Sequence, residues 1–129
     1  MMTVGPAAWL RAIPAALWAA LIWTLSSMPD VPGSSWVTIP FADKIAHFVL
    51  FFVQALWLRW AGVPAWLAFS MATVWGGIDE LHQRSVPGRD PDIWDFVADT
   101  VGAAAGSIRP WIRILNTQLS KARFSRPQR

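Results

Sequence analysis

Ionisable side chains recur at helical spacing in separate segments of this chain. In one segment Asp43 and His47 are four residues apart, with Lys44 beside the aspartate. In a later segment Asp95 and Asp99 are also four residues apart. Residues three or four apart share one face of a helix, so each segment presents its polar groups together. A carboxylate on the turn before a histidine can orient the imidazole. We therefore expect Asp43 to orient His47, which could then act as an acid or base or bind a ligand.

A third polar segment lies between these two. Glu80 and Gln83 share one helix face, as do Asp79 and Gln83. An ionised side chain placed in lipid costs about 2.5 to 3.5 kcal/mol even on a lenient scale, so the three polar stripes are expected to face one another. Arg89 could hold a carboxylate or a phosphate with two parallel hydrogen bonds. The available counter-ions are Lys44, Arg84 and Arg89.

Blocks of apolar residues must position these groups. The 129-residue chain is 54% hydrophobic and 15% charged, and charged residues and turns divide its apolar residues into blocks. This distribution is typical of membrane proteins. We therefore expect an all-α polytopic membrane protein with four short transmembrane helices in a compact bundle. The predicted spans are residues 7–27, 45–60, 64–78 and 93–110, and the third helix should continue to Gln83.

The first span has an alternative interpretation. Arg11 precedes an apolar stretch and small residues follow it, as in a cleaved signal peptide. If it is a helix that stays, Pro14 is expected to kink it. Residues 30–40 and 85–92 are predicted loops because they are rich in proline and glycine. The predicted domains are a membrane domain, 1–110, and a basic cytoplasmic tail, 111–129.

The distribution of charge predicts the orientation. With both termini in the cytoplasm, eight of the eleven basic residues lie inside, which satisfies the positive-inside rule. All eight carboxylates then lie on the other side of the membrane. Acidic residues do not set topology, so their segregation indicates one polar site that faces away from the cytoplasm.

No cofactor, required metal or nucleic acid is expected. Carboxylates with one histidine would suit magnesium or manganese, but no H-E-x-x-H spacing is present, and Glu80, Leu81 and His82 supply only half of it. The chain has no cysteine. Its basic residues gather in the tail without interleaved aromatic residues, which disfavours nucleic acid as a partner.

Three motifs together resemble the VanZ-like family. They are D-K-I-A-H-F at 43–48, D-E-L-H-Q-R-S-V-P-G-R at 79–89 and D-F-V-A-D-T-V-G-A-A-A-G at 95–106, so the resemblance covers roughly residues 41–106. That family comprises small bacterial four-helix membrane proteins, named for a member that confers low-level teicoplanin resistance. The resemblance implies the bacterial cytoplasmic membrane as location. The recurrent polar positions that it implies are Asp43, Lys44, His47, Asp79, Glu80, Gln83, Arg89 and Asp95.

Asp99 departs from the family pattern, which commonly has asparagine at this position. We keep Asp99 among the binding candidates, where it would add a negative charge or share a proton.

Three functions remain open at this point, each with membrane lipids as partners and with the oligomeric state undetermined. The leading hypothesis is an envelope protein that binds a lipid-linked or glycopeptide-like polar group and modulates teicoplanin sensitivity. The second is a hydrolase or transferase acting on a lipid headgroup or lipid-linked saccharide, with His47 or Glu80 as acid or base. The third is a structural or assembly partner, in which the polar residues form an ion-pair network and Gly102 and Gly106 support helix packing.

Overall fold

The regular secondary structure in the described part of the chain is entirely helical. The computed structural model describes residues 9–30 and 39–108, and this part contains no strand. A short 3-10 helix, Trp9–Ala12, leads into the first of four α-helices. The four are α1 (Ile13–Ser26), α2 (Ala42–Trp60), α3 (Ala65–Gln83) and α4 (Ile93–Ser107). The predicted tail, 111–129, and most of the predicted loop 30–40 lie outside the described residues.

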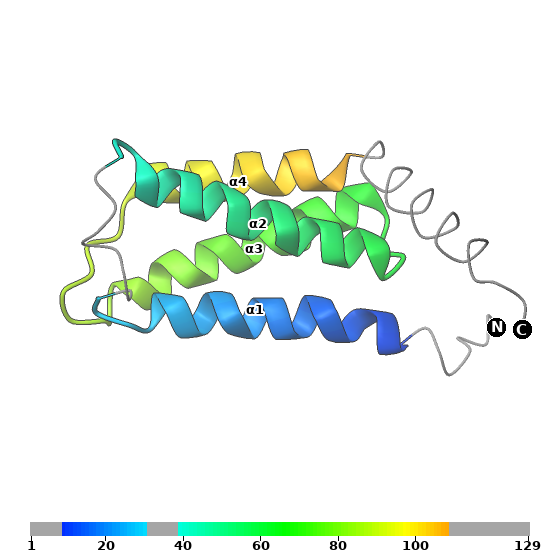
Figure 1. The fold of residues 1–129 in the computed structure, drawn as a ribbon, viewed down its shortest axis with the longest axis horizontal. Helices are drawn as coiled ribbons and strands as arrows, with labels where there is room; N and C mark the ends of the chain where they lie inside the picture. The colour runs from blue at the N-terminus through cyan, green and yellow to red at the C-terminus, as the bar shows by residue number, and fades with distance from the viewer. Residues whose placement is uncertain (1–8, 31–38, 109–129) are drawn as a thin grey trace, which may run out of the picture.

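The helices run alternately in opposite directions along one long axis (Figure 1). At one end of the bundle α1 and α3 finish while α2 and α4 begin. The three segments with ionisable residues at helical spacing, at the start of α2, the end of α3 and the start of α4, therefore reach this end. We call it the acidic end. At the opposite end α1 and α4 have their other termini, and the turn between α2 and α3 lies there too.

The observed helix bounds confirm some expectations and correct others. The third helix continues past its apolar block to Gln83, as predicted. Pro14 lies in the first turn of α1, which begins at Ile13 directly after the 3-10 helix, and the kink expected there stays a prediction. A proline there loses no helical hydrogen bond, since the first backbone N–H groups have no partner within a helix. The fourth helix ends at Ser107, after which Ile108 has an extended backbone.

Two glycines bring α4 very close to α2. A Cβ atom at Gly102 would collide with the backbone carbonyl of Phe48, and one at Gly106 would collide with that of Phe52. Only a residue without a side chain permits this approach of two helix backbones. Gly102 and Gly106, which form a G-x-x-x-G spacing, therefore pack against another helix of the same chain, as expected for small residues four apart. This contact explains how side chains of α2 and α4 come to share one site.

Among the described helices, one is long and apolar enough to cross a membrane by length and composition alone, namely Trp9–Ser26. Helix α4 has 15 residues. At about 1.5 Å per residue such a helix reaches roughly 22 Å, less than the ~30 Å of bilayer hydrocarbon. The prediction of four helices is confirmed, whereas the prediction that all four span the membrane stays a prediction.

Candidate functional site

Lys44 connects α2 to the beginning of α4. Its Nζ atom lies 2.8 Å from a carboxylate oxygen of each of Asp43, Asp92 and Asp95. An ammonium group has three N–H donors, so these three contacts use its whole donor capacity. Lys44 is thus the counter-ion that the sequence predicts, and it pairs with carboxylates of both α2 and α4.

Asp92 has two roles at the start of α4. One oxygen, Oδ1, accepts a hydrogen bond of 2.9 Å from the backbone N–H of Trp94 and so caps the helix, and the other binds Lys44. A carboxylate at a helix N-terminus also interacts favourably with the helix dipole. The hydrogen bond from Lys44, with that from the Trp94 backbone, holds the pKa of Asp92 below its ordinary value of 3.8.

His47 pairs with α4 and not with its own helix. Its Nδ1 lies 2.8 Å from Oδ1 of the fully buried Asp99, and its Nε2 lies 3.7 Å from Oδ2 of Asp95. The predicted orienting partner, Asp43, instead binds Lys44, and its side chain is 62% exposed. The prediction of that partner was wrong because the close approach of α4 brings the Asp99 carboxylate to the imidazole.

Several buried carboxylate oxygens have no hydrogen-bond partner in the described part of the chain. They include both oxygens of Glu80, Oδ2 of Asp99 and Oδ1 of Asp79. A buried carboxylate without partners is costly, so such atoms indicate a missing donor or cation. One ligating atom each from His47, Glu80 and Asp95 lie within 4.8 Å of one another.

The side chains around His47 and Lys44 form one group at the acidic end, which we call the acidic cluster. Its members are Asp43, Lys44, His47, Glu80, Asp92, Asp95 and Asp99.

Asp79 links α3 to α1, and Gln83 on the same helix supports it. Asp79 Oδ2 accepts a 2.6 Å hydrogen bond from the Ser26 hydroxyl and a 3.3 Å hydrogen bond from Gln83 Nε2. All three side chains are buried. Of these two predicted site residues, Asp79 therefore attaches α3 to α1, and Gln83 donates a hydrogen bond to Asp79 from the next turn of α3. Sequence reasoning missed Ser26, because a lone serine at a helix end gives no signal of a partner on another helix.

Arg89 binds backbone carbonyls. Its Nε and Nη2 donate hydrogen bonds of 2.9 Å to the carbonyl oxygens of Met28 and Leu25. These carbonyls lie at the C-terminal end of α1, where the helix has no further N–H donors, and a cation there is also favoured by the helix dipole. Arg89 therefore caps the end of α1, and these two hydrogen bonds take the place of the expected contact with a carboxylate or a phosphate. Every ion pair within the described residues involves Lys44 or His47, and Arg84 takes part in none of them.

Two further polar residues contact α1 and not the acidic cluster. Gln54, which shares a helix face with His47, donates a 3.3 Å hydrogen bond to the Ala15 carbonyl. His82 stacks on Trp23 with ring centroids 3.9 Å apart and makes a 2.9 Å hydrogen bond with the Ser27 hydroxyl. His82 thus belongs to the packing of α1 against α3.

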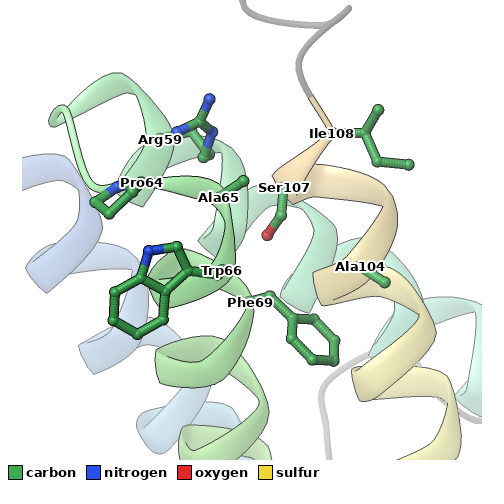
Figure 2. Close-up of a pocket in the computed structure, with 8 residues that line it drawn as sticks. All are labelled: Arg59, Pro64, Ala65, Trp66, Phe69, Ala104, Ser107 and Ile108. Atoms are coloured by element: carbon green, nitrogen blue, oxygen red, sulfur yellow. The ribbon is translucent and has the colours of Figure 1, made fainter.

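A groove of about 630 Å³ lies at the opposite end of the molecule, between α3 and α4 (Figure 2). Trp66 and Phe69 come to it from α3, and Ala104 and Ile108 from the end of α4. Its charged lining residue, Arg59, donates a 2.8 Å hydrogen bond to the Val63 carbonyl. The groove brings together no carboxylate or histidine of the described residues, whereas the acidic end holds both kinds of side chain.

Comparison with known proteins identifies a family for this chain. Searches among curated proteins and among solved structures returned no match. The sequence model of the VanZ/LLP1 family matches residues 3–113, which adds α1 to the 41–106 region of the three motifs. Proteins of the VanZ family are membrane proteins, in agreement with the apolar helix Trp9–Ser26. Because the match covers most of its 129 residues, the chain belongs to the VanZ/LLP1 family.

Proposed function

We propose that this VanZ/LLP1 protein is a four-span protein of the bacterial cytoplasmic membrane that binds the polar group of a lipid-linked or glycopeptide-like molecule. Binding at the acidic cluster would lower sensitivity to the glycopeptide teicoplanin. The observation that carries the proposal is Glu80, whose two buried carboxylate oxygens lack partners beside His47 and Asp95. A purely structural ion-pair network would satisfy its own buried charges, because unpaired ones cost stability.

The charge of the acidic cluster indicates the ligand chemistry. Five carboxylates, two of them on α4 itself, share one lysine and one histidine. Ionised carboxylates accept hydrogen bonds and donate none. The cluster therefore suits a ligand rich in amino, amide or hydroxyl donors, which are the groups that a glycopeptide or a saccharide presents.

The exposure of the cluster indicates how a ligand reaches it. The side chain of Asp43 is 62% exposed, that of Lys44 is 25% exposed and that of His47 is 13% exposed, while Asp99 is fully buried. Burial thus increases from the acidic end towards the middle of the bundle. A headgroup at the membrane surface could enter by this route without crossing the apolar part of the helices.

The outer surface of the bundle supports the membrane topology. Each helix leaves large apolar side chains exposed, among them Leu17, Val49, Val74 and Val101. Apolar surface on every helix of a small bundle is unfavourable in water and suits a hydrocarbon solvent. With four spans, both termini and the basic residues 109–129 would lie in the cytoplasm, and the acidic cluster would face the other side.

A second candidate function is catalysis on the same class of ligand, and the pairing of His47 with Asp99 favours it. A carboxylate that fixes one imidazole nitrogen leaves the other available as a general base. Glu80 could then act as the acid in a hydrolase or transferase reaction on a headgroup. Turnover of a lipid-linked saccharide by purified protein would separate this candidate from binding alone.

Teicoplanin sensitivity tests the leading proposal. A lipoglycopeptide-sensitive bacterium would express the wild type, His47→Ala, Glu80→Gln or Asp90→Asn at equal membrane abundance. Asp90 is an exposed carboxylate at the same end of the molecule, so its variant is a matched control. We expect the wild type and Asp90→Asn to protect cells, and His47→Ala and Glu80→Gln to behave like empty vector. Equal sensitivity with and without the wild-type protein would contradict the proposal.

A further inference from the structure

We propose that His47, Glu80 and Asp95 bind one divalent transition-metal ion of the class of Mn²⁺ and Zn²⁺. The three residues come from α2, α3 and α4, and their ligating atoms lie within 4.8 Å of one another. The role of the ion as the contact for a headgroup rests on the proposed function. The binding of the ion itself can be measured without any headgroup.

The environment of His47 matches that of a metal-ligating histidine. Such a histidine usually donates its second ring N–H to a carboxylate, which fixes the ring and leaves the other nitrogen free for the metal. Asp99 is this carboxylate, because its Oδ1 lies 2.8 Å from Nδ1. The remaining nitrogen, Nε2, then faces Oδ2 of Asp95 at 3.7 Å.

Asp95 is oriented in a similar way. Lys44 holds its Oδ1 at 2.8 Å, which leaves Oδ2 on the side of His47. The carboxylate is therefore fixed by one oxygen and available through the other. A ligand that is already held in place loses little conformational freedom when the ion binds.

The unpaired oxygens provide an independent indication of a cation. Both oxygens of Glu80 are buried without a hydrogen-bond partner in the described residues, and so is Oδ2 of the fully buried Asp99. A divalent ion would satisfy Glu80 directly. Its two charges would balance those of Glu80 and Asp95, with His47 neutral as metal binding requires.

The donor set selects the class of ion. Calcium and magnesium prefer sites made of oxygen atoms, whereas an imidazole nitrogen with two carboxylates suits manganese or zinc. Metal–ligand bonds of about 2.0 to 2.2 Å place ligating atoms at most roughly 4.4 Å apart. The triad therefore needs only a small contraction around the ion. Three protein ligands also leave coordination positions open, through which the ion could bind a headgroup oxygen.

Metal binding by the full-length protein in nanodiscs tests the proposal. After removal of metals with EDTA, MnCl₂ is added and free Mn²⁺ is followed by its electron paramagnetic resonance signal. ZnCl₂ is then added as a competitor. We expect one bound Mn²⁺ per wild-type chain, displaced by Zn²⁺, and the same affinity in Asp90→Asn. Glu80→Gln and His47→Gln should lose the site, and Asp99→Asn should bind about 10- to 100-fold more weakly, as typical for an outer carboxylate.

Circular dichroism and size-exclusion chromatography establish that each variant is folded. Glu80→Gln is the decisive variant because the Glu80 carboxylate accepts no hydrogen bond from the described residues. Absence of stoichiometric Mn²⁺ and Zn²⁺ binding by folded wild type would overturn the metal site, as would an unchanged affinity in Glu80→Gln. Metal binding without any effect on teicoplanin sensitivity would support the site and overturn only the proposed function. Protection by a protein that binds no metal would overturn the metal site and support the proposed function.

Discussion

At the scale of single residues, Lys44 is the side chain on which most ionic contacts of the described chain depend. Its ammonium group contacts three carboxylates on two helices and is only 25% exposed. If a neutral side chain replaces it, Asp95 is left with a mostly buried oxygen and no cation. The cost of removing one partner of such a pair exceeds the net value of the pair, because the other charge stays buried.

The variant Lys44→Met should therefore be less stable than the wild type by about 1 to 3 kcal/mol. Thermal unfolding in detergent, followed by the fluorescence of the ten tryptophans, measures this as a lower Tm. The double variant Lys44→Met/Asp95→Asn should recover part of the loss, because it removes the stranded charge as well. A Tm equal to that of the wild type in Lys44→Met would show that the three contacts are energetically irrelevant.

The sequence predicts which residues are polar partners better than it predicts how they pair. Lys44 was expected to be a counter-ion and is one. Asp99 as the partner of His47 could not be predicted, because spacing along one helix says nothing about the register between two helices. The possible metal ligands come from three helices for the same reason, so they form no motif along the chain. Arg89 binds carbonyls of α1, a contact that depends on a loop whose path the sequence does not specify.

At the scale of elements, the contact between α2 and α4 determines the geometry of the site. Gly102 and Gly106 let α4 approach α2 so closely that the carboxylates of α4 reach Lys44 and His47. The spacing of Gly102 and Gly106 predicts a close approach of another helix at these positions, but it does not predict that α2 is that helix. The bounds of α3 were anticipated too, because its apolar block is too short to span a bilayer unless the helix continues through Gln83.

The variants Gly102→Ala and Gly106→Ala should each destabilise the bundle by about 1 to 3 kcal/mol, because the added methyl group forces the two backbones apart. Gly77→Ala is a matched control, since its Cβ would meet only Phe96 at an ordinary contact distance of 3.6 Å. That variant should be neutral or slightly stabilising, as alanine is the better helix former. Thermal unfolding of the three proteins measures the difference, and equal Tm values would contradict the packing described for α2 and α4.

At the scale of the whole molecule, the alternating helices place the acidic cluster at one end and the turn between α2 and α3 at the other (Figure 1). If all four helices cross the membrane, these two ends lie on opposite sides of it. The exposed apolar surface of each helix would then contact lipid. By length and composition one described helix, Trp9–Ser26, is a candidate span. The polar residues of the site reduce the mean hydropathy of α2 and α3, and α4 has only 15 residues.

Cysteine labelling tests this topology, and the natural chain has no cysteine to interfere. Pro87 is exposed in the loop before α4, and Ala65 is exposed at the start of α3. In spheroplasts, a membrane-impermeant maleimide should label Pro87→Cys and should label Ala65→Cys only after lysis. Labelling of both positions before lysis, or of Ala65→Cys alone, would exclude the proposed four-span orientation.

In the proposed function the acidic cluster binds a ligand and is not merely a structural ion-pair network. Glu80→Gln distinguishes the two most directly, because it removes a charge from a side chain whose oxygens have no partner within the described residues. The decisive measurement is the teicoplanin sensitivity of cells that contain this variant, at the membrane abundance and Tm of the wild type. The proposal predicts that protection is lost although the protein remains stable. Full protection by a stable Glu80→Gln variant would contradict it.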